Sequence, residues 1–261
     1  DTQNFMDLYN DLKTFNLLDR CVVVDNTKDE TLFEMYNVPH IYIPGYPLFY
    51  ISLTKKIPPY VAEPKNMFLC LNNYNKPHRL ATIAMLSKKN MLRKTAWSYR
   101  ETATVQNQTY NPTKIVPDWD NKMVNFQTPK HLDQSDGDFD QDANMSALYG
   151  SAVTSIATET DYIFDKTSFA TEKCYNAIHY GALLIAVSCP GTIDIMREHG
   201  IDVYDDMINH SYDHIKDPIE RFKAIEIAVE DNYAIGGYKQ LRTALSPRIL
   251  RNQMLLTHHD H

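Results

Sequence analysis

Short apolar segments alternate with helix-forming segments along the second half of this chain. The clearest apolar run covers residues 182–188, and Gly181 precedes it as the expected end of a helix. A second helix is expected at about 192–199, with Gly200 at its end. Apolar runs of this length between helices are typical of strands that are buried on both faces of a parallel sheet. The alternation predicts an α/β fold with a mainly parallel, doubly wound sheet.

Further apolar runs extend the same pattern. Strands are expected at 21–24, 40–43, 67–71, 96–99, 155–158 and 201–204, and further helices at 3–18, 31–36 and 79–89. The strongest helix start is Asp217, an expected N-cap, with Pro218 at the first helical position and Glu220 in a capping box. Residues 100–145 are polar and predict no particular element, and the prolines between 57 and 64 indicate a linker.

Charge and composition narrow the possible classes of protein. The net charge of −7 argues weakly against a broad nucleic-acid-binding surface. The longest apolar runs are much shorter than the ~18 residues that a membrane helix needs, and no signal peptide is visible. The cysteines lie far apart and form no Cys-x-x-Cys pair; they are Cys21, Cys70, Cys174 and Cys189. Free buried thiols in a reducing compartment are therefore expected, which indicates a cytoplasmic protein without a membrane span.

Two places where a strand is expected to lead into a helix carry positively charged side chains. Lys173 follows Glu172 at the start of the helix before Gly181, and Arg79 stands at the start of the helix after strand 67–71. A helix N-terminus attracts anions, and a cation there adds a full positive charge for a phosphate. If the two strands are neighbours, Arg79 and Lys173 converge in one crevice and form a diphosphate site. The plainer alternative is an ordinary helix cap with solvated charges.

The order of several short motifs resembles a family of enzymes. Residues 72–79 precede an apolar helix, and residues 161–173 end in Thr-Glu-Lys, followed by Asn176, Ala177 and Gly181. This pattern is similar to the donor half of fucosyltransferase-like glycosyltransferases. Viral and bacteriophage glycosyltransferases with two Rossmann-like domains are similar in four later segments, at 189–192, 197–200, 211–213 and 217–221. The resemblance covers about residues 66–232.

The resemblance implies a fold of two Rossmann-like domains with parallel sheets, the GT-B type. Residues 1–65 would form a reduced N-terminal domain on the acceptor side. Residues 66–234 would form the domain that binds the nucleotide sugar. Residues 235–261 would form a C-terminal helical segment that packs back on the first domain.

The resemblance also implies roles for residues that bind the donor. Arg79 and Lys173 would hold the diphosphate, and Glu172 would bind the ribose hydroxyls. Tyr162 or Phe164 would stack on the base, with plain packing as the alternative. The full donor-binding set is Asn73, Arg79, Glu159, Tyr162, Phe164, Thr171, Glu172, Lys173 and Asn176.

The catalytic base would come from the N-terminal part of the chain. An inverting transferase needs a carboxylate or histidine near the acceptor hydroxyl, and the candidates are Asp25, Glu30 and His40. A retaining mechanism needs no such base, and the sequence leaves both mechanisms open. Glu159 would contact the donor sugar, with a solvated loop carboxylate as the alternative.

No metal cofactor is expected, because cationic side chains and helix dipoles would stabilise the leaving diphosphate. The acidic residues between 133 and 142 match a calcium loop only in composition. The acceptor would be a glycan, or alternatively a modified base in DNA, which would need a basic cleft built from Lys55, Lys56, Lys88, Lys89, Arg93 and Lys94. The rival class of protein is a non-catalytic module that binds a nucleotide sugar. A viral protein of either class would work in the host cytoplasm.

Overall fold

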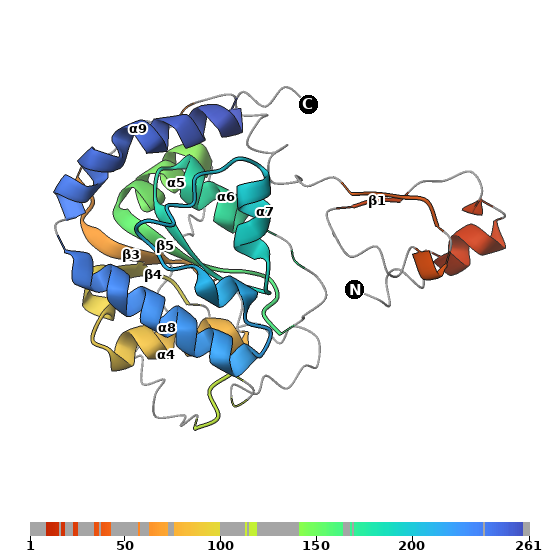
Figure 1. The fold of residues 1–261 in the computed structure, drawn as a ribbon, viewed down its shortest axis with the longest axis horizontal. Coiled ribbons are helices and arrows are strands. Elements are labelled where there is room, and N and C mark those ends of the chain that lie inside the picture. The colour runs from red at the N-terminus through yellow and green to blue at the C-terminus, as the bar shows by residue number, and fades with distance from the viewer. Residues whose placement is uncertain are drawn as a thin grey trace.

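The computed structural model describes residues 9–15, 17–18, 23–25, 34–36, 38–42, 57, 63–72, 76–99, 113, 115–118, 141–163, 168, 170–236 and 238–257. Within these ranges, residues 23–25, 40–42, 141–144 and 238–239 are described by their backbone alone. Most of the described residues belong to one α/β domain, which begins close to the start of β3 (Figure 1).

A four-stranded parallel sheet forms the centre of this domain. Its strands are β3 (Asn66–Cys70), β4 (Thr95–Trp97), β5 (Ala152–Thr158) and β6 (Leu183–Val187), in the spatial order β4-β3-β5-β6. Each neighbouring pair is parallel. β5 and β6 are buried along their whole length, as expected for strands covered on both faces. The predicted α/β fold with a parallel, Rossmann-like sheet is therefore confirmed for this domain.

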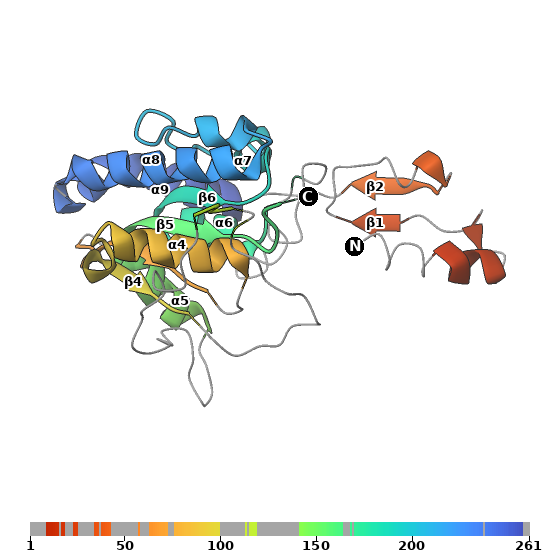
Figure 2. The ribbon, with the colours of Figure 1, turned by 90° about the horizontal axis from the view of Figure 1, so that it is seen from below.

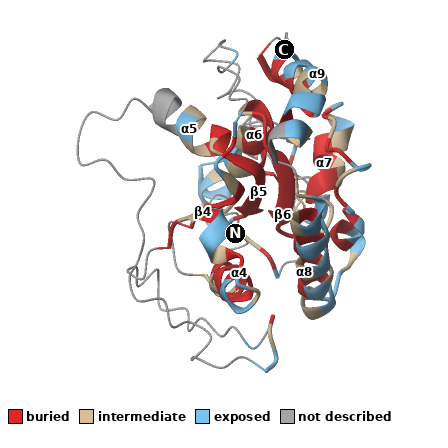
Figure 3. Ribbon diagram, turned by 90° about the vertical axis from the view of Figure 1, so that its left-hand side faces the viewer, coloured by how far each residue is buried: buried red, intermediate tan, exposed pale blue. Residues whose placement is uncertain are grey.

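Helices cover both faces of the sheet and give the domain three layers (Figure 1, Figure 2). α4 (Pro77–Lys88) and α8 (Pro218–Ile235) lie on one face, and ion pairs from Lys89 to Glu226 and Glu230 join them. α5 (Gln141–Gly150), α6 (Glu172–His179) and α9 (Tyr238–Thr257) lie on the other face. Figure 3 shows the buried residues concentrated in the strands and on the helix sides that face them. The sequence analysis assigned no element to most of α5, because the segment before it gave no apolar period.

The helix ends in this domain follow from local sequence. The Asp217 carboxylate accepts hydrogen bonds from the N–H groups of Ile219 and Glu220, both at 2.9 Å, so α8 begins as predicted. Thr171 caps α6, because its hydroxyl accepts from the N–H of Lys173. The backbone φ values of 78° at Gly181 and 74° at Gly200 end α6 and α7 (Thr192–Glu198) in the left-handed region that glycine favours.

The strand expected at 201–204 does not form, and this prediction was wrong. Tyr204 has a φ of 63°, and its N–H donates to Oδ1 of Asp202 at 3.0 Å, which closes a turn where an extended chain was expected. Two side chains meet the edge of β6 in place of another strand. The hydroxyl of Tyr212 accepts from a backbone N–H of β6, and a ring nitrogen of His210 bonds a backbone carbonyl of β6, both at 3.0 Å. β6 is therefore an edge strand of this sheet.

The C-terminal helix α9 packs against α6. Arg242 donates to the carbonyl oxygens of Ala152 at 2.7 Å and Tyr180 at 3.0 Å, and Gln253 donates to that of His179 at 2.8 Å. The described contacts of α9 are thus with the domain of the four-stranded sheet. That residues 235–261 also pack back on the N-terminal domain stays a prediction.

The described N-terminal residues contain a separate parallel sheet of two strands, β1 (Val23–Asp25) and β2 (His40–Tyr42). Both strands lie where the apolar runs predict them. The parallel pairing places the carboxyl ends of β1 and β2 on one edge. The division of the chain into two domains stays a prediction.

The described part of the chain contains no helix long and apolar enough to cross a membrane. Its cysteines are Cys70, Cys174 and Cys189, and all three are buried free thiols, as predicted.

Candidate functional site

The sheet has a topological switch point between β3 and β5. The chain leaves β3 through α4 toward β4 on one side, and it enters β5 on the other side of β3 after α5. In open α/β sheets, ligands bind at the carboxyl ends of the strands at such a point. The two loops predicted to carry the donor site, 72–79 and 161–173, follow these two strands. Since β3 and β5 are hydrogen-bonded neighbours, the condition for the two loops to converge is met.

Asn72 joins the ends of three strands at this point. Its side-chain oxygen accepts a hydrogen bond from the hydroxyl of Thr158, the last residue of β5, at 2.7 Å. Its backbone N–H donates to the hydroxyl of Ser98, after β4, at 3.0 Å, and its side-chain amide donates to the Ser98 carbonyl at 3.3 Å. All three residues are buried. The base of the site is therefore held by buried hydrogen bonds that join the ends of β3, β4 and β5.

The start of α4 packs against the segment that follows β5. Nε2 of His78 lies 2.8 Å from the carbonyl oxygen of Glu159, and the Arg79 guanidinium donates to the carbonyl oxygens of Thr158 at 3.5 Å and Glu159 at 3.3 Å. Burial lowers the pKa of His78 from 6.5 to about 3, so the ring is neutral and Nε2 carries the proton that the carbonyl accepts. Burial also lowers the pKa of Arg79, whose exposed fraction is 3%. Arg79 lies at the predicted place, enclosed against the end of β5.

Glu159 is the central carboxylate of the site, and its exposed fraction is 0%. Its Oε1 accepts from the N–H of Thr171 at 2.9 Å, and its Oε2 accepts from the Thr171 hydroxyl. Nζ of Lys173 lies 3.9 Å from Oε2. Glu159 therefore fixes the N-cap of α6, and its burial argues against the alternative of a solvated loop carboxylate.

Lys173 and Glu172 form a partly exposed ion pair in the first turn of α6. Nζ of Lys173 donates to Oε1 of Glu172 at 2.8 Å and to the hydroxyl of Thr171 at 3.1 Å. Burial raises the pKa of Glu172, but the Lys173 ammonium outweighs it and lowers that pKa below its usual value. The Lys173 side chain is 26% exposed and that of Glu172 55%, so a ligand from solvent can reach both.

Lys76, the N-cap residue of α4, belongs to the same group of charges. Its Nζ donates to a backbone carbonyl after β5 and lies 3.9 Å from Oδ1 of Asp161. Burial lowers the pKa of Lys76, Asp161 raises it, and the nearby Arg79 and Lys173 lower it further. The sequence analysis did not single out Lys76. The available signal was the proline that follows it, because proline at the first helical position marks the preceding residue as the N-cap.

Tyr162 is packed inside the domain, with an exposed fraction of 1%. The His78 ring stacks on it with the ring centroids 5.6 Å apart, and the Arg221 guanidinium lies over it at 4.4 Å from the centroid. Its hydroxyl donates to the carbonyl oxygen of Pro218 at 2.8 Å. A ring enclosed in this way matches the alternative of plain packing and leaves little of its surface for stacking on a nucleotide base.

The structure brings together part of the predicted set, namely Arg79, Glu159, Thr171, Glu172 and Lys173. Asn176 lies one turn further along α6 and is half-buried. The remaining predictions fall outside the described residues or side chains: Asn73, Phe164 and Glu30 entirely, and Asp25 and His40 in their side chains.

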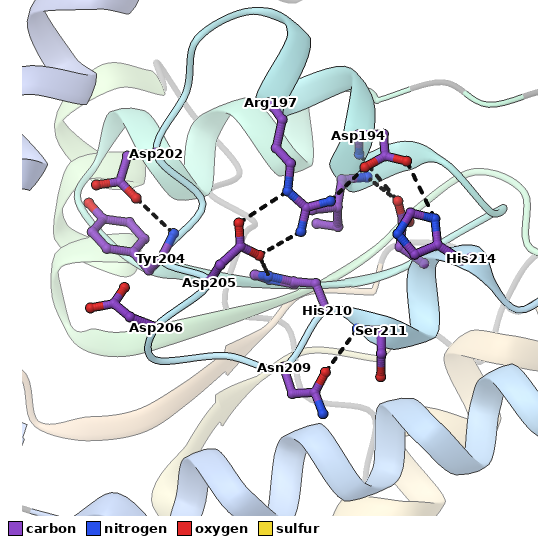
Figure 4. Close-up of polar contacts among 12 residues, drawn as sticks. Asp194, Arg197, Asp202, Tyr204, Asp205, Asp206, Asn209, His210, Ser211 and His214 are labelled. Carbon is purple, nitrogen blue, oxygen red and sulfur yellow. Dashed lines mark hydrogen bonds and ion pairs between the residues drawn. The ribbon is translucent and has the colours of Figure 1, made fainter.

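A concavity of about 550 Å³ lies beside α7, away from the switch point, and Figure 4 shows the polar contacts among its residues. It is lined by Arg197, Asp205, Asp206, Met207, Ile208, Asn209, His210, Ser211, His214 and Asp231. Its charged groups largely neutralise one another. Arg197 pairs with Asp194 at 2.6 Å and with Asp205 at 2.5 Å, and Nδ1 of His210 lies 3.1 Å from Oδ1 of Asp205. These contacts hold the segment between α7 and α8 in place.

Within the described ranges, no group of three or more histidine, cysteine, aspartate or glutamate side chains is arranged to hold a metal ion. The acidic segment with the composition of a calcium loop lies outside the described side chains. Comparison of the chain with protein-family models, with curated proteins and with solved structures found no match.

Proposed function

We propose that this protein is a glycosyltransferase that transfers a sugar from a nucleotide-diphosphate sugar to a hydroxyl acceptor. The observation that carries the proposal is the convergence of the loops after β3 and β5 at the switch point of a Rossmann-like sheet. There, Lys173 stands in the first turn of α6 beside the buried carboxylate of Glu159. A helix N-terminus with a lysine suits a phosphate, and an exposed carboxylate next to it suits sugar hydroxyls.

Lys173, Glu172 and Glu159 have different parts in binding the donor. The Lys173 ammonium pairs with the diphosphate, and Glu172, released from Lys173, accepts hydrogen bonds from the ribose hydroxyls. Glu159 keeps α6 in position through both of its bonds to Thr171. Through Thr171, Glu159 thus positions the Lys173 ammonium. Because Glu159 is buried, its carboxylate stays bonded to Thr171 instead of to water.

The transfer step needs an acceptor side. In Figure 2, the arrowheads of β1 and β2 point toward the larger domain, which supports an arrangement with two sheets whose carboxyl ends face each other. The acceptor oxygen attacks the anomeric carbon, and the bond from that carbon to the β-phosphate oxygen breaks. The nucleoside diphosphate leaves with the electron pair. In an inverting reaction, Asp25, Glu30 or His40 takes the hydroxyl proton.

The leaving diphosphate is stabilised in this proposal by cationic side chains and the α6 N-terminus, without a metal ion. The acceptor is a glycan or a modified base in DNA. The buried free thiols support a reducing setting such as the cytoplasm.

The test is donor binding followed by transfer. A thermal-shift screen over UDP-, GDP- and CMP-sugars identifies the nucleotide, and product formation or slow donor hydrolysis is then measured. Lys173→Ala should weaken donor binding by about tenfold or more, because a charge-assisted hydrogen bond contributes about 1.5–3 kcal/mol. Glu172→Ala should abolish turnover. Lys223→Ala is the matched control, since Lys223 lies on the exposed side of α8 and pairs only with Glu220 in the described contacts. Unchanged affinity in Lys173→Ala would remove the basis of the site.

The second candidate is a module that binds a nucleotide sugar without transferring it. One observation favours it: all the donor-site contacts described above lie within the domain of the four-stranded sheet. Donor binding without any transfer or hydrolysis, over a broad panel of acceptors, would select the module.

A further inference from the structure

Arg79, the cation predicted to bind the diphosphate together with Lys173, already bonds backbone carbonyl groups. The Arg79 guanidinium donates to the carbonyl oxygens of Thr158 and Glu159, and only 3% of the residue is exposed. Thr158 is the last residue of β5, and the Glu159 carbonyl that follows also accepts a hydrogen bond from Nε2 of His78 at 2.8 Å. Moving the Arg79 guanidinium toward a ligand would break its bonds to both carbonyls at this buried place, which is costly. Arg79 therefore positions the end of β5.

Lys76 is the cation at the start of α4 that can bind the diphosphate in place of Arg79. It is the N-cap of α4, a helix of 12 residues, and its side chain is 23% exposed. Its ammonium donates to the carbonyl oxygen of Thr160 and lies 3.9 Å from Oδ1 of Asp161, whose side chain is 38% exposed. The partner carboxylate can thus turn into solvent when a ligand anion arrives.

Lys173 has the corresponding position at the start of α6, the helix that follows β5. Each lysine lies at the N-terminal end of the helix that follows one of the two central strands, and each pairs with a partly exposed carboxylate, Asp161 or Glu172. The segment 159–161 separates them, because Lys76 bonds at residue 160 and Lys173 lies 3.9 Å from the Glu159 carboxylate. The two ammonium groups are close enough that Lys173 acts on the pKa of Lys76, so a diphosphate, with one phosphoryl group for each lysine, suits the pair.

We infer that Lys76 and Lys173 together form the diphosphate site of this protein, with Arg79 as a positioning residue. Assignment of the diphosphate to a nucleotide sugar rests on the proposed function; the paired-lysine site itself does not. Burial lowers the pKa of Lys76, and repulsion from Arg79 and Lys173 lowers it further; an anion that binds between the two lysines relieves this repulsion. Asp161 and Glu172 are then displaced toward solvent, and the buried Glu159 stays on Thr171.

The test uses inorganic pyrophosphate as the probe and the full chain as the protein. Isothermal titration calorimetry compares the wild type with Lys76→Gln, Lys173→Gln and the double variant, and Lys223→Gln is the control on α8. Each site variant should bind pyrophosphate about tenfold more weakly or worse, as expected for the loss of a charge-assisted contact. The control should bind as the wild type does. Orthophosphate, which has one phosphoryl group where pyrophosphate has two, should bind the wild type more weakly than pyrophosphate.

A further variant separates charge from folding. Lys76→Arg keeps the cation and should retain most of the affinity that Lys76→Gln loses, while thermal melting shows that both variants fold. Wild-type affinity in Lys76→Gln, or no pyrophosphate binding by the wild type, would overturn the inference.

The failure of the inference and that of the proposed function are distinguishable. Pyrophosphate binding that depends on both lysines, without turnover of any nucleotide sugar, supports the site and removes the glycosyltransferase. Sugar transfer that is unimpaired in Lys76→Gln supports the enzyme and removes Lys76 from the site.

Discussion

The side-chain oxygen of Asn72 accepts a hydrogen bond from the Thr158 hydroxyl at 2.7 Å, and this bond closes the switch point between β3 and β5. A similar bond lies four residues earlier on β5, where the Thr154 hydroxyl donates to Oδ1 of Asn232 at 2.8 Å. Both pairs are buried. They differ in location, since only the first lies beside the loop that carries Lys76.

This pair of bonds gives a matched test of the site. Thr158→Val and Thr154→Val should each destabilise the protein by about 1–3 kcal/mol, because each leaves a buried amide oxygen without its donor. Urea unfolding measures the loss. Only Thr158→Val should also weaken pyrophosphate binding, because it removes the bond that ties Asn72, next to the loop that carries Lys76, to the end of β5. Equal binding by the two variants would show that the switch point does not hold the ligand loops.

Acid should destabilise the protein through buried histidines. Burial holds the pKa of His78 at about 3 and that of His179 at about 4, against a usual value of 6.5. Between these values the unfolded chain binds protons that the folded protein does not, so stability is present above about pH 6.5 and falls as the pH drops through this window. In His78→Gln the pH dependence of the unfolding free energy should be smaller by about one proton, while the glutamine amide can still donate to the Glu159 carbonyl. A slope identical to that of the wild type between pH 6.5 and 4 would contradict this assignment.

The packing of α9 on α6 depends on the absence of a side chain at Gly181. A Cβ there would lie 2.8 Å from Cγ2 of Ile249, whereas at Gly200, which ends α7 in the same way, the nearest contact would be 3.8 Å from Leu255. Gly200→Ala should lose only the cost of the left-handed backbone, about 1–2 kcal/mol. Gly181→Ala should lose a further amount of about 1–3 kcal/mol, because α9 must move. Thermal unfolding of the two variants checks the difference, and equal losses would show that α9 adapts without strain.

Chelation tests the metal-free part of the proposed mechanism. Once a donor is identified, sugar transfer should continue in EDTA, because lysine side chains and a helix N-terminus stabilise the leaving diphosphate. Full loss of transfer in EDTA, with recovery on addition of Mg²⁺ or Mn²⁺, would refute the metal-free mechanism and direct attention to the acidic segment near Asp136.

Local sequence determined the elements that carry this site. The apolar runs at 67–71, 155–158 and 182–188 correspond to β3, β5 and β6, and the capping pattern placed Asp217 at the start of α8. These signals are local, because a strand buried on both faces must be apolar throughout and a cap bonds within three residues of itself. The sequence also named Arg79 and Lys173 as members of one crevice, on the condition that their strands were neighbours, and the family resemblance added Glu159.

Only the tertiary structure decided what each of those residues does. The strand order that makes β3 and β5 neighbours depends on pairing between residues more than 80 positions apart, which no local pattern encodes. Burial distinguishes the two cations at the start of α4. Arg79 is enclosed against the backbone carbonyls at the end of β5, whereas Lys76 stays partly exposed. The apolar run at 201–204 had the composition of a strand, but the side chains of His210 and Tyr212 already satisfied the edge of β6. Hydrogen-bond partners and exposure are properties of the packed chain, and they are what assign a role to each charge.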